Sequence, residues 1–294
     1  MSQSSPKIDD LRREIDSLDD AIHDLLVKRV RVTERIAEAK QKTDGGRQFV
    51  RPGREAQILR RLLARHKGAM PRPVVARIWR EMIAAVCRMH SRIKVAVCAP
   101  VKSVGYWDLA RDHYGSATPM TLHHSPQIVL RMVSENDDVM GVLPVPGQND
   151  DPPWWPYLAT DVESAPRIIA RLPFVADAGS RIEDLDALVV ARIPPEPSGD
   201  DVSLLAVAAD EEVSRDRLRE ILMSAGIDGH PIAIHSEGTE AAGWLHLVEV
   251  AGFVAGNDRR LAAVVDADPG TVRGVVSLGA YAAPSPTDQS AAPK

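Results

Sequence analysis

The sequence predicts a multidomain protein in which an all-α, three-helix N-terminal segment precedes an α/β unit and an α+β unit. Three observations carry this prediction. Residues 8–40 lack proline and glycine, and their apolar side chains recur in steps of three and four, as one face of a helix requires. From residue 93, short apolar runs alternate with helical patterns. Residues 202–281 then follow the order strand, helix, strand, strand, helix, strand.

The first helix organises the N-terminal segment. Its apolar stripe consists of Ile8, Leu11, Ile15, Leu18, Ile22, Leu25, Val32, Ile36 and Ala39. Between Leu25 and Val32 the stripe carries Arg29, and a guanidinium on a core-facing position is costly unless an anionic group meets it. At about 1.5 Å per residue the helix spans roughly 50 Å, which is longer than a small domain is wide. We therefore expect this stripe to be buried by packing partners, and a second copy of the chain would supply them.

Two shorter helices complete this segment. The second opens at residues 51–55, with a proline in its first turn. Its apolar face consists of Ile58, Leu59, Leu62 and Leu63. The third runs from about residue 74 to residue 92, and it carries two adjacent apolar stripes. A helix that is apolar on two faces is packed deeply.

Strands and helices alternate in the α/β unit. Strands are expected at residues 94–98, 118–122, 139–145, 167–176 and 187–193, and helices at residues 107–114 and 127–134. This alternation favours a largely parallel sheet. Trp154 and Trp155 are interpreted as the anchor of the long loop between the third and fourth strands.

A proline-rich linker at residues 194–199 separates the last unit. Its strands are expected at residues 202–208, 232–235, 244–250 and 272–281, with helices at residues 214–225 and 257–266. That element order is the ferredoxin-like one. The expected domains are residues 1–92, 93–197 and 200–283, followed by a disordered tail at residues 284–294 that is rich in Ala, Pro and Ser.

Composition excludes several classes of function. The net charge of -5 and the pI near 6.0 argue against nucleic acid as the main partner. Apolar runs fall short of the roughly 20 residues of a membrane span, and no secretory signal is visible. Cys87 and Cys98 are expected to be small buried thiols, so we expect a cytoplasmic protein. The histidines follow no metal-ligand spacing, and neither a metal nor a cofactor is predicted.

Several basic side chains conflict with the helical pattern. Lys40 follows Arg29 by three turns and lies on nearly the same side, and Arg54 falls in the first turn of the second helix, which attracts anions. Arg12 would reach the same spot only across an antiparallel dimer. Converging cations predict a pocket for a small molecule with two carboxylates. Glu55 would bind a hydroxyl group of that molecule. The alternative for each arginine alone is a surface side chain that extends into water.

Five motifs connect this segment with a known family. They are Leu11-Arg12-x-x-Ile15-x-x-Leu18-Asp19, Leu25-Leu26-x-x-Arg29, Ile36-Ala37-x-Ala39-Lys40, Arg51-Pro52-Gly53-Arg54-Glu55-Ala56 and Trp79-Arg80-Glu81-Met82-Ile83. In this order they resemble the all-helical chorismate mutase family across residues 8–92. The resemblance implies an intertwined homodimer through the long helix. Each pocket would take Arg12 from the partner chain and Arg29, Lys40, Arg54 and Glu55 from its own.

The resemblance also implies a reaction, the rearrangement of chorismate to prephenate in phenylalanine and tyrosine biosynthesis. Lys40 would donate to the ether oxygen on which negative charge develops, and Arg29 would help to bind the two carboxylates. His90 stands where the family has a second donor, usually glutamine, and a histidine can donate in either protonation state. Alternatively, His90 merely caps an apolar stripe. Val86 replaces a small polar residue that often contacts a carboxylate in the family.

The following α/β unit resembles the prephenate dehydratase part of bifunctional enzymes. The resemblance rests on Val95-Ala96-Val97-Cys98-Ala99-Pro100, Leu109-Ala110-x-x-His113-Tyr114-Gly115 and Gly141-Val142-Leu143-Pro144-Val145. Ala191-Arg192-Ile193 replaces the family's Thr-Arg-Phe signature, and Pro146-Gly147-Gln148 replaces its acidic-amide-serine run. The resemblance therefore implies an inactive, truncated remnant of a periplasmic-binding-like domain.

Residues 200–283 resemble an ACT domain, a regulatory module that binds phenylalanine. Its effector-binding turn reads Val213-Ser214-Arg215 here, so an aromatic amino acid effector and a purely structural role both stay open. For the whole chain we expect a chorismate mutase with a degenerate extension. A non-catalytic protein that binds a metabolite or a partner enzyme is the alternative, and a working bifunctional enzyme is the third hypothesis.

Overall fold

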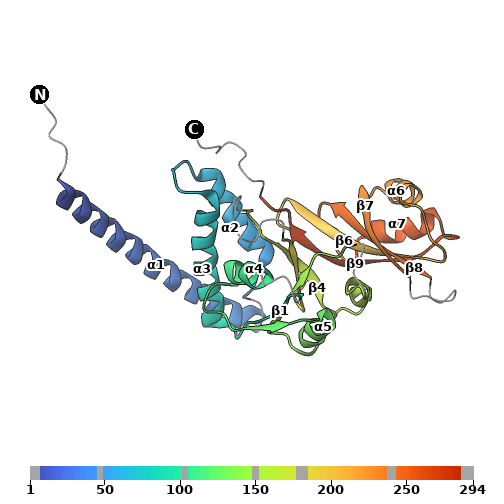
Figure 1. The fold of residues 1–294 in the computed structure, drawn as a ribbon, viewed down its shortest axis with the longest axis horizontal. Helices are drawn as coiled ribbons and strands as arrows, with labels where there is room; N and C mark the ends of the chain where they lie inside the picture. Colours follow the sequence, from blue (N-terminus) through green and yellow to red (C-terminus); the bar gives the residue numbers. More distant parts are fainter. Residues whose placement is uncertain are drawn as a thin grey trace, which may run out of the picture. The chain divides into compact units, whose positions relative to one another are not determined.

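The protein is described here by a computed structural model that covers residues 7–44, 49–100, 105–147, 152–176, 185–236 and 243–285 (Figure 1). It divides into two compact units, residues 1–49 and residues 50–294. Gln148 and residues 286–294 of the predicted tail lie outside the described residues. Among the described helices, none is both long enough and apolar enough to cross a membrane.

The first unit is built on helix α1 (Ile8–Asp44), which begins at the predicted residue. Its apolar stripe is exposed, with 57% exposure at Ile15 and Leu18 and 64% at Leu25. The predicted stripe is therefore not buried within the first unit. Among the described residues of this unit no other element covers the face, so its burial requires a surface outside the unit.

Helices α2 (Pro52–Arg65) and α3 (Arg72–His90) open the second unit at nearly the predicted positions. The buried residues of α2 are Gly53, Ala56, Leu59 and Leu63, which lie on one face. Arg60 connects α2 to the linker and to the C-terminal part of the chain, because its guanidinium donates to Ser198 Oγ at 2.8 Å and to the Ala283 carbonyl at 3.0 Å. Arg51 adds an ion pair with Glu196 at 2.9 Å.

The second unit contains one sheet with the strand order β2-β1-β3-β5-β4-β9-β6-β8-β7 in the described residues. Its first part comprises β1 (Lys94–Cys98), β2 (Met120–His123), β3 (Val139–Pro144), β4 (Arg167–Leu172) and β5 (Ala187–Ala191). Helices α4 (Gly105–Tyr114) and α5 (Pro126–Glu135) contribute to separate hydrophobic clusters. β1 pairs in parallel with β2 and β3.

The prediction of a largely parallel sheet is wrong for β4 and β5. β5 pairs antiparallel with both β3 and β4. Antiparallel neighbours need no crossover helix, and the described residues between β4 and β5 contain none. All five residues of β5 are apolar and buried. Such a continuous apolar run is compatible with either strand direction.

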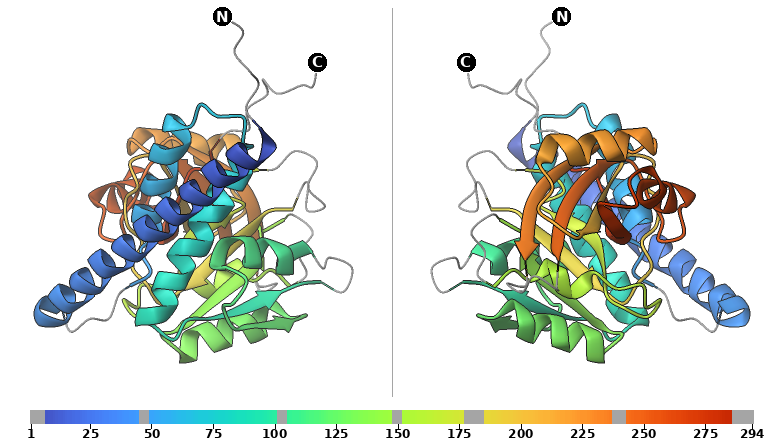
Figure 2. Two further views of the ribbon diagram at one scale, coloured as in Figure 1. Left: turned by 90° about the vertical axis from the view of Figure 1, so that its left-hand side faces the viewer. Right: turned by 90° about the vertical axis from the view of Figure 1, so that its right-hand side faces the viewer.

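The C-terminal part of the second unit has the predicted ferredoxin-like order of strands and helices. It comprises β6 (Asp201–Ala209), α6 (Arg215–Ser224), β7 (Gly229–Ser236), β8 (Trp244–Ala251), α7 (Arg259–Ala267) and β9 (Val272–Ala282). The four strands are antiparallel in the order β9-β6-β8-β7. α6 and α7 share one hydrophobic cluster with one face of these strands (Figure 2).

The α/β part and the ferredoxin-like part of this sheet meet at a seam between β4 and β9, where Ile168 pairs in parallel with Gly279. Gly279 has φ +134°, and a Cβ there would lie 2.5 Å from the Ile168 nitrogen, so this approach requires glycine. The α/β and ferredoxin-like parts therefore form one continuous sheet. The domain boundaries at residues 92, 197 and 283 stay predictions.

Buried side chains confirm two sequence interpretations. Trp154 and Trp155 are almost fully buried at the short helix η1 (Trp155–Leu158), and Trp154 Nε1 donates to the Pro144 carbonyl at 3.0 Å. The pair is thus a loop anchor. Cys87 and Cys98 are both buried, and neither forms a disulfide. Burial raises the pKa of the Cys98 thiol to about 11, so this thiol stays protonated at neutral pH.

Candidate functional site

Three of the predicted ligand-binding cations lie on α1. Arg12 is exposed and donates to Asp9 at 3.2 Å. Arg29 and Lys40 are partly buried and belong to one side of the helix. The Lys40 ammonium lies 5.8 Å from the centre of the Phe49 ring. The helix therefore brings Arg29 and Lys40 to a common face, as the spacing predicts.

The other predicted residues lie on α2 and α3. Arg54 is exposed and donates to Gln57 at 3.3 Å, whereas Glu55 beside it is partly buried. Val86 and His90 are four residues apart and partly buried, so they share a face near the end of α3. The structure thus brings Arg54 together with Glu55 and Val86 together with His90. The complete pocket would combine residues of both units and stays a prediction.

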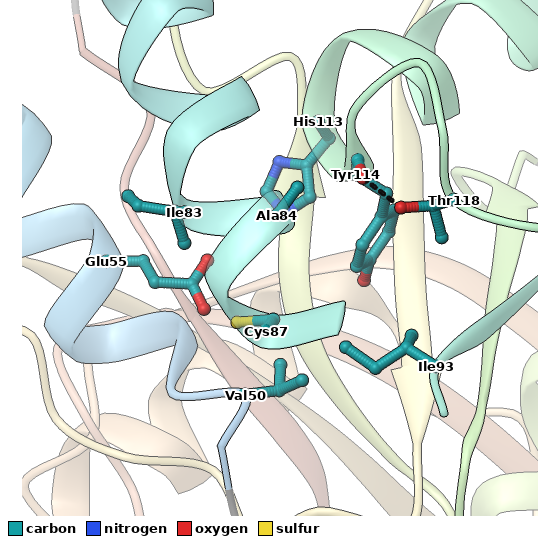
Figure 3. Close-up of a pocket in the computed structure, with 9 residues that line it drawn as sticks. All are labelled: Val50, Glu55, Ile83, Ala84, Cys87, Ile93, His113, Tyr114 and Thr118. Atoms are coloured by element: carbon teal, nitrogen blue, oxygen red, sulfur yellow. Dashed lines mark hydrogen bonds between the residues drawn. The ribbon is translucent and has the colours of Figure 1, made fainter. Parts of the chain in front are cut away.

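Glu55 borders a small cavity between α2, α3 and α4 (Figure 3). The residues around it are Val50, Glu55, Ile83, Ala84, Cys87, Ile93, His113, Tyr114 and Thr118. Arg54, Val86 and His90 are not among them. Of the predicted substrate-binding side chains, Glu55 therefore lines this cavity and the other residues of α2 and α3 in that set do not.

Arg80 is a charged residue at this site that the sequence pattern did not single out. Its Nη1 atom donates to Glu55 Oε2 at 2.8 Å, and only 7% of the Arg80 side chain and 13% of the Glu55 side chain are exposed. Burial lowers the pKa of Arg80, and the charge of Glu55 opposes that shift. A signal was present, because Arg80 interrupts the buried face of α3 between Ala76 and Ile83. The same reasoning had selected Arg29.

The groups of α4 that face this pair are neutral near pH 7. Burial holds the pKa of His113 well below its ordinary value, and the charge of Arg80 adds to the effect. Burial also raises the pKa of the Tyr114 phenol, with the charge of Glu55 contributing. The cavity is therefore a weakly polar environment in which Arg80 supplies the positive charge next to Glu55.

Folding stability should fall with decreasing pH because of His113. Its pKa is lowered in the folded state, so the unfolded chain binds the proton more readily, and stability is lost as the pH falls below about 6.5. One such proton contributes a slope of up to about 1.4 kcal/mol per pH unit. The measurement is the free energy of unfolding by urea between pH 7 and pH 5. His113→Phe should flatten the curve, and an unchanged slope would contradict this assignment.

Arg192, the arginine of the altered dehydratase signature, is engaged in local contacts. Its guanidinium donates to the Ser164 carbonyl at 3.0 Å and pairs with Asp137 at 3.0 Å. The preceding residue, Ala191, ends β5 and provides no hydroxyl. Arg192 therefore connects the loops that contain Asp137 and Ser164 to the end of β5.

Comparisons with known proteins find a family match in the N-terminal segment. Residues 11–91 match the family described as chorismate mutase type II. The bifunctional chorismate mutase/prephenate dehydratase of Pseudomonas aeruginosa is 32% identical over 138 residues, which cover 46% of this chain and 38% of that protein. That of Aquifex aeolicus is 30% identical over 147 residues, or 47% of this chain and 39% of that protein. The matches thus span about two fifths of the length of these curated relatives.

The similarity to solved structures is more distant. The structure of prephenate dehydratase from Streptococcus mutans covers 66% of this chain and all of its own, with 14% sequence identity and a TM-score of 0.44. A TM-score below 0.5 supports no assignment of activity. Residues 11–91 therefore carry the similarity that bears on function.

Proposed function

Residues 11–91 belong to the chorismate mutase type II family, and we propose that this segment catalyses the rearrangement of chorismate to prephenate. The match across these residues is the observation that carries the proposal. It includes the five positions at which the sequence pattern alone predicted ligand-binding charges, which are Arg12, Arg29, Lys40, Arg54 and Glu55. The protein would accordingly be an isomerase.

The proposed mechanism uses binding and electrostatics alone. The reaction is a Claisen rearrangement within one molecule, which needs no nucleophile from the enzyme and no proton transfer. Arg29, Arg54 and the partner's Arg12 would hold the two carboxylates and keep the substrate in its compact reactive shape. Lys40 and His90 would donate to the ether oxygen as its bond breaks, where a positioned donor is most effective. Glu55 would accept a hydrogen bond from the substrate hydroxyl.

A homodimer through α1 is part of this proposal. The apolar stripe of α1 is exposed along its length in one chain, from Leu11 at 43% to Leu25 at 64%. A continuous apolar surface of this kind is typical of an interface. A second copy would cover the stripe with its own and would bring its Arg12 to the opposite pocket, because α1 is long enough to carry residues of both sites.

For residues 93–283 we propose a supporting role without dehydratase activity. The contacts of Arg192 and the alanine at position 191 favour this assignment. The ferredoxin-like order of β6–β9 supports the proposal of an ACT-like module, and an aromatic amino acid is its candidate effector. The two buried cysteines, which form no disulfide, fit a reducing cytoplasm as the location.

Chorismate turnover by the purified full chain tests the proposed function. We expect chorismate to disappear with formation of prephenate, and we expect no phenylpyruvate at neutral pH. Formation of phenylpyruvate would contradict the assignment of residues 93–283. Binding of prephenate without any turnover of chorismate would instead favour a non-catalytic metabolite-binding protein. The Arg29→Ala variant is the control, because it should lose both turnover and binding.

A further inference from the structure

The pair formed by Glu55 and Arg80 connects the proposed mutase site to the rest of the chain. We propose that Arg80 is a positioning residue for Glu55 and that Phe174, from the α/β part, holds Arg80 in place. The downstream region would then contribute to the mutase reaction through packing rather than through chemistry of its own. This inference rests on the proposed function and extends it to residues outside the matched segment.

The charge of Glu55 depends on a compensating partner. A buried carboxylate stays ionised only if a cation or several donors compensate it. Arg80 provides a hydrogen bond to Oε2 at 2.8 Å, and the Arg51 backbone N–H donates to Oε1 at 3.3 Å. The other titratable groups at the cavity, Cys87 on α3 and His113 and Tyr114 on α4, are not cations at neutral pH. Arg80 is therefore the cation that keeps Glu55 an acceptor.

The orientation of Glu55 depends on the same two contacts. An ionised carboxylate offers about four lone-pair sites, and these two contacts leave sites free for a ligand. The contact with Arg80 fixes one oxygen, and the backbone contact at the start of α2 restrains the other. Glu55 is therefore held in one orientation with accepting capacity left, as a substrate hydroxyl requires.

An aromatic ring from a distant segment holds Arg80 in place. The Phe174 ring lies 5.8 Å from the Arg80 guanidinium carbon and 5.6 Å from that of Arg60, within the range of cation–π contact. Phe174 is 7% exposed and packs with Ala56, Leu59 and Ala76 of the two mutase helices. Its backbone carbonyl accepts from the Ser285 N–H at 2.7 Å, just beyond β9. Phe174 thus ties Arg80 to the seam of the sheet.

Removal of the charge should change both affinity and pH dependence. In an Arg80→Met variant the Glu55 carboxylate loses its cation, and a buried carboxylate without a cation favours its neutral form. A protonated Glu55 no longer offers two accepting oxygens to the substrate hydroxyl. We expect kcat/KM for chorismate to fall by about 10- to 100-fold at neutral pH, mainly through KM, and to recover as the pH rises.

The experiment compares full-length variants. kcat and KM are measured between about pH 6 and pH 9 for the wild type, Arg80→Met, Arg80→Lys and Phe174→Leu. Arg77→Met is the matched control, because Arg77 lies on the same helix and pairs with Asp112 at 2.8 Å without touching Glu55. Arg80→Lys should restore the wild-type pH profile in part. Phe174→Leu should raise KM, but by less than Arg80→Met does. Arg77→Met should leave the profile unchanged.

A second readout separates this inference from the proposed function. The titration of the Glu55 carboxyl is followed by NMR of a carbon-13-labelled chain, with Glu55→Gln to assign the signal. Glu55 should titrate at a higher pH in Arg80→Met than in the wild type. An unchanged titration, or an Arg80→Met profile equal to that of Arg77→Met, would overturn the inference. A wild type without turnover would overturn the proposed function, while the titration would still test the pair. If Arg80→Met fails to fold, Arg80→Lys and Phe174→Leu carry the test.

Discussion

Replacing Lys40 with methionine is expected to lower kcat/KM for chorismate by about 10²- to 10³-fold. Methionine keeps most of the length of the side chain and removes the charge and the donors. A donor to the ether oxygen acts most strongly in the transition state, so the loss should appear in kcat more than in KM. The measurement is steady-state kinetics of chorismate consumption. Folding is monitored by circular dichroism, because Lys40 is partly buried and lies near Phe49.

Lys28→Met is the matched control for this variant. Lys28 lies on the same helix, carries the same charge and is exposed. It is not one of the positions assigned to the pocket, so its replacement should change kcat/KM by less than a few-fold. Equal losses in Lys28→Met and Lys40→Met would show that the overall charge of α1 matters, and the assignment of Lys40 to the ether oxygen would be wrong.

Leu18→Glu is expected to convert the proposed dimer into monomers and to abolish most of the mutase activity. Leu18 is 57% exposed in one chain and lies in the middle of the apolar stripe. In the dimer its side chain would be buried against a second copy, and burial of an unpaired carboxylate there is strongly unfavourable. Because each pocket would need the partner's Arg12, the monomer should lose activity by at least about 100-fold.

The mass of the variant in solution, measured by light scattering, tests this prediction together with the kinetics. His23→Glu is the control, because His23 is exposed on the other side of α1 and receives the same new charge. It should remain dimeric and active. A monomeric wild type with full turnover would contradict the proposed dimer and the shared pocket.

Local pattern was sufficient for most elements of the fold. The steps of three and four in residues 8–40 predict α1 with its observed start, and the expected strand at residues 94–98 coincides with β1. The same pattern could not tell whether the stripe of α1 would be covered, because coverage depends on a surface outside the helix. Nor could it fix the direction of β5, since a fully buried strand reads alike in parallel and antiparallel sheets.

The candidate site divides in a similar way. Glu55 was identified from a local motif, and in the structure it borders a small cavity. Its partner Arg80 carried a local signal, namely a charge on a buried helix face. Phe174 carried none, because it belongs to a distant segment and reaches the site only through the seam between β4 and β9. Contacts between distant segments depend on the tertiary fold, which the periodicity of a segment does not encode.

The central claim is a mutase pocket that two chains share, and a complementation experiment tests it most directly. Arg12→Ala and Arg29→Ala should each be nearly inactive alone, because each homodimer lacks one arginine in both pockets. Co-expression in equal amounts should give heterodimers with one intact pocket, and about a quarter of the wild-type turnover should return. If the mixture stays as inactive as its components, Arg12 and Arg29 do not meet across two chains, and the account is contradicted.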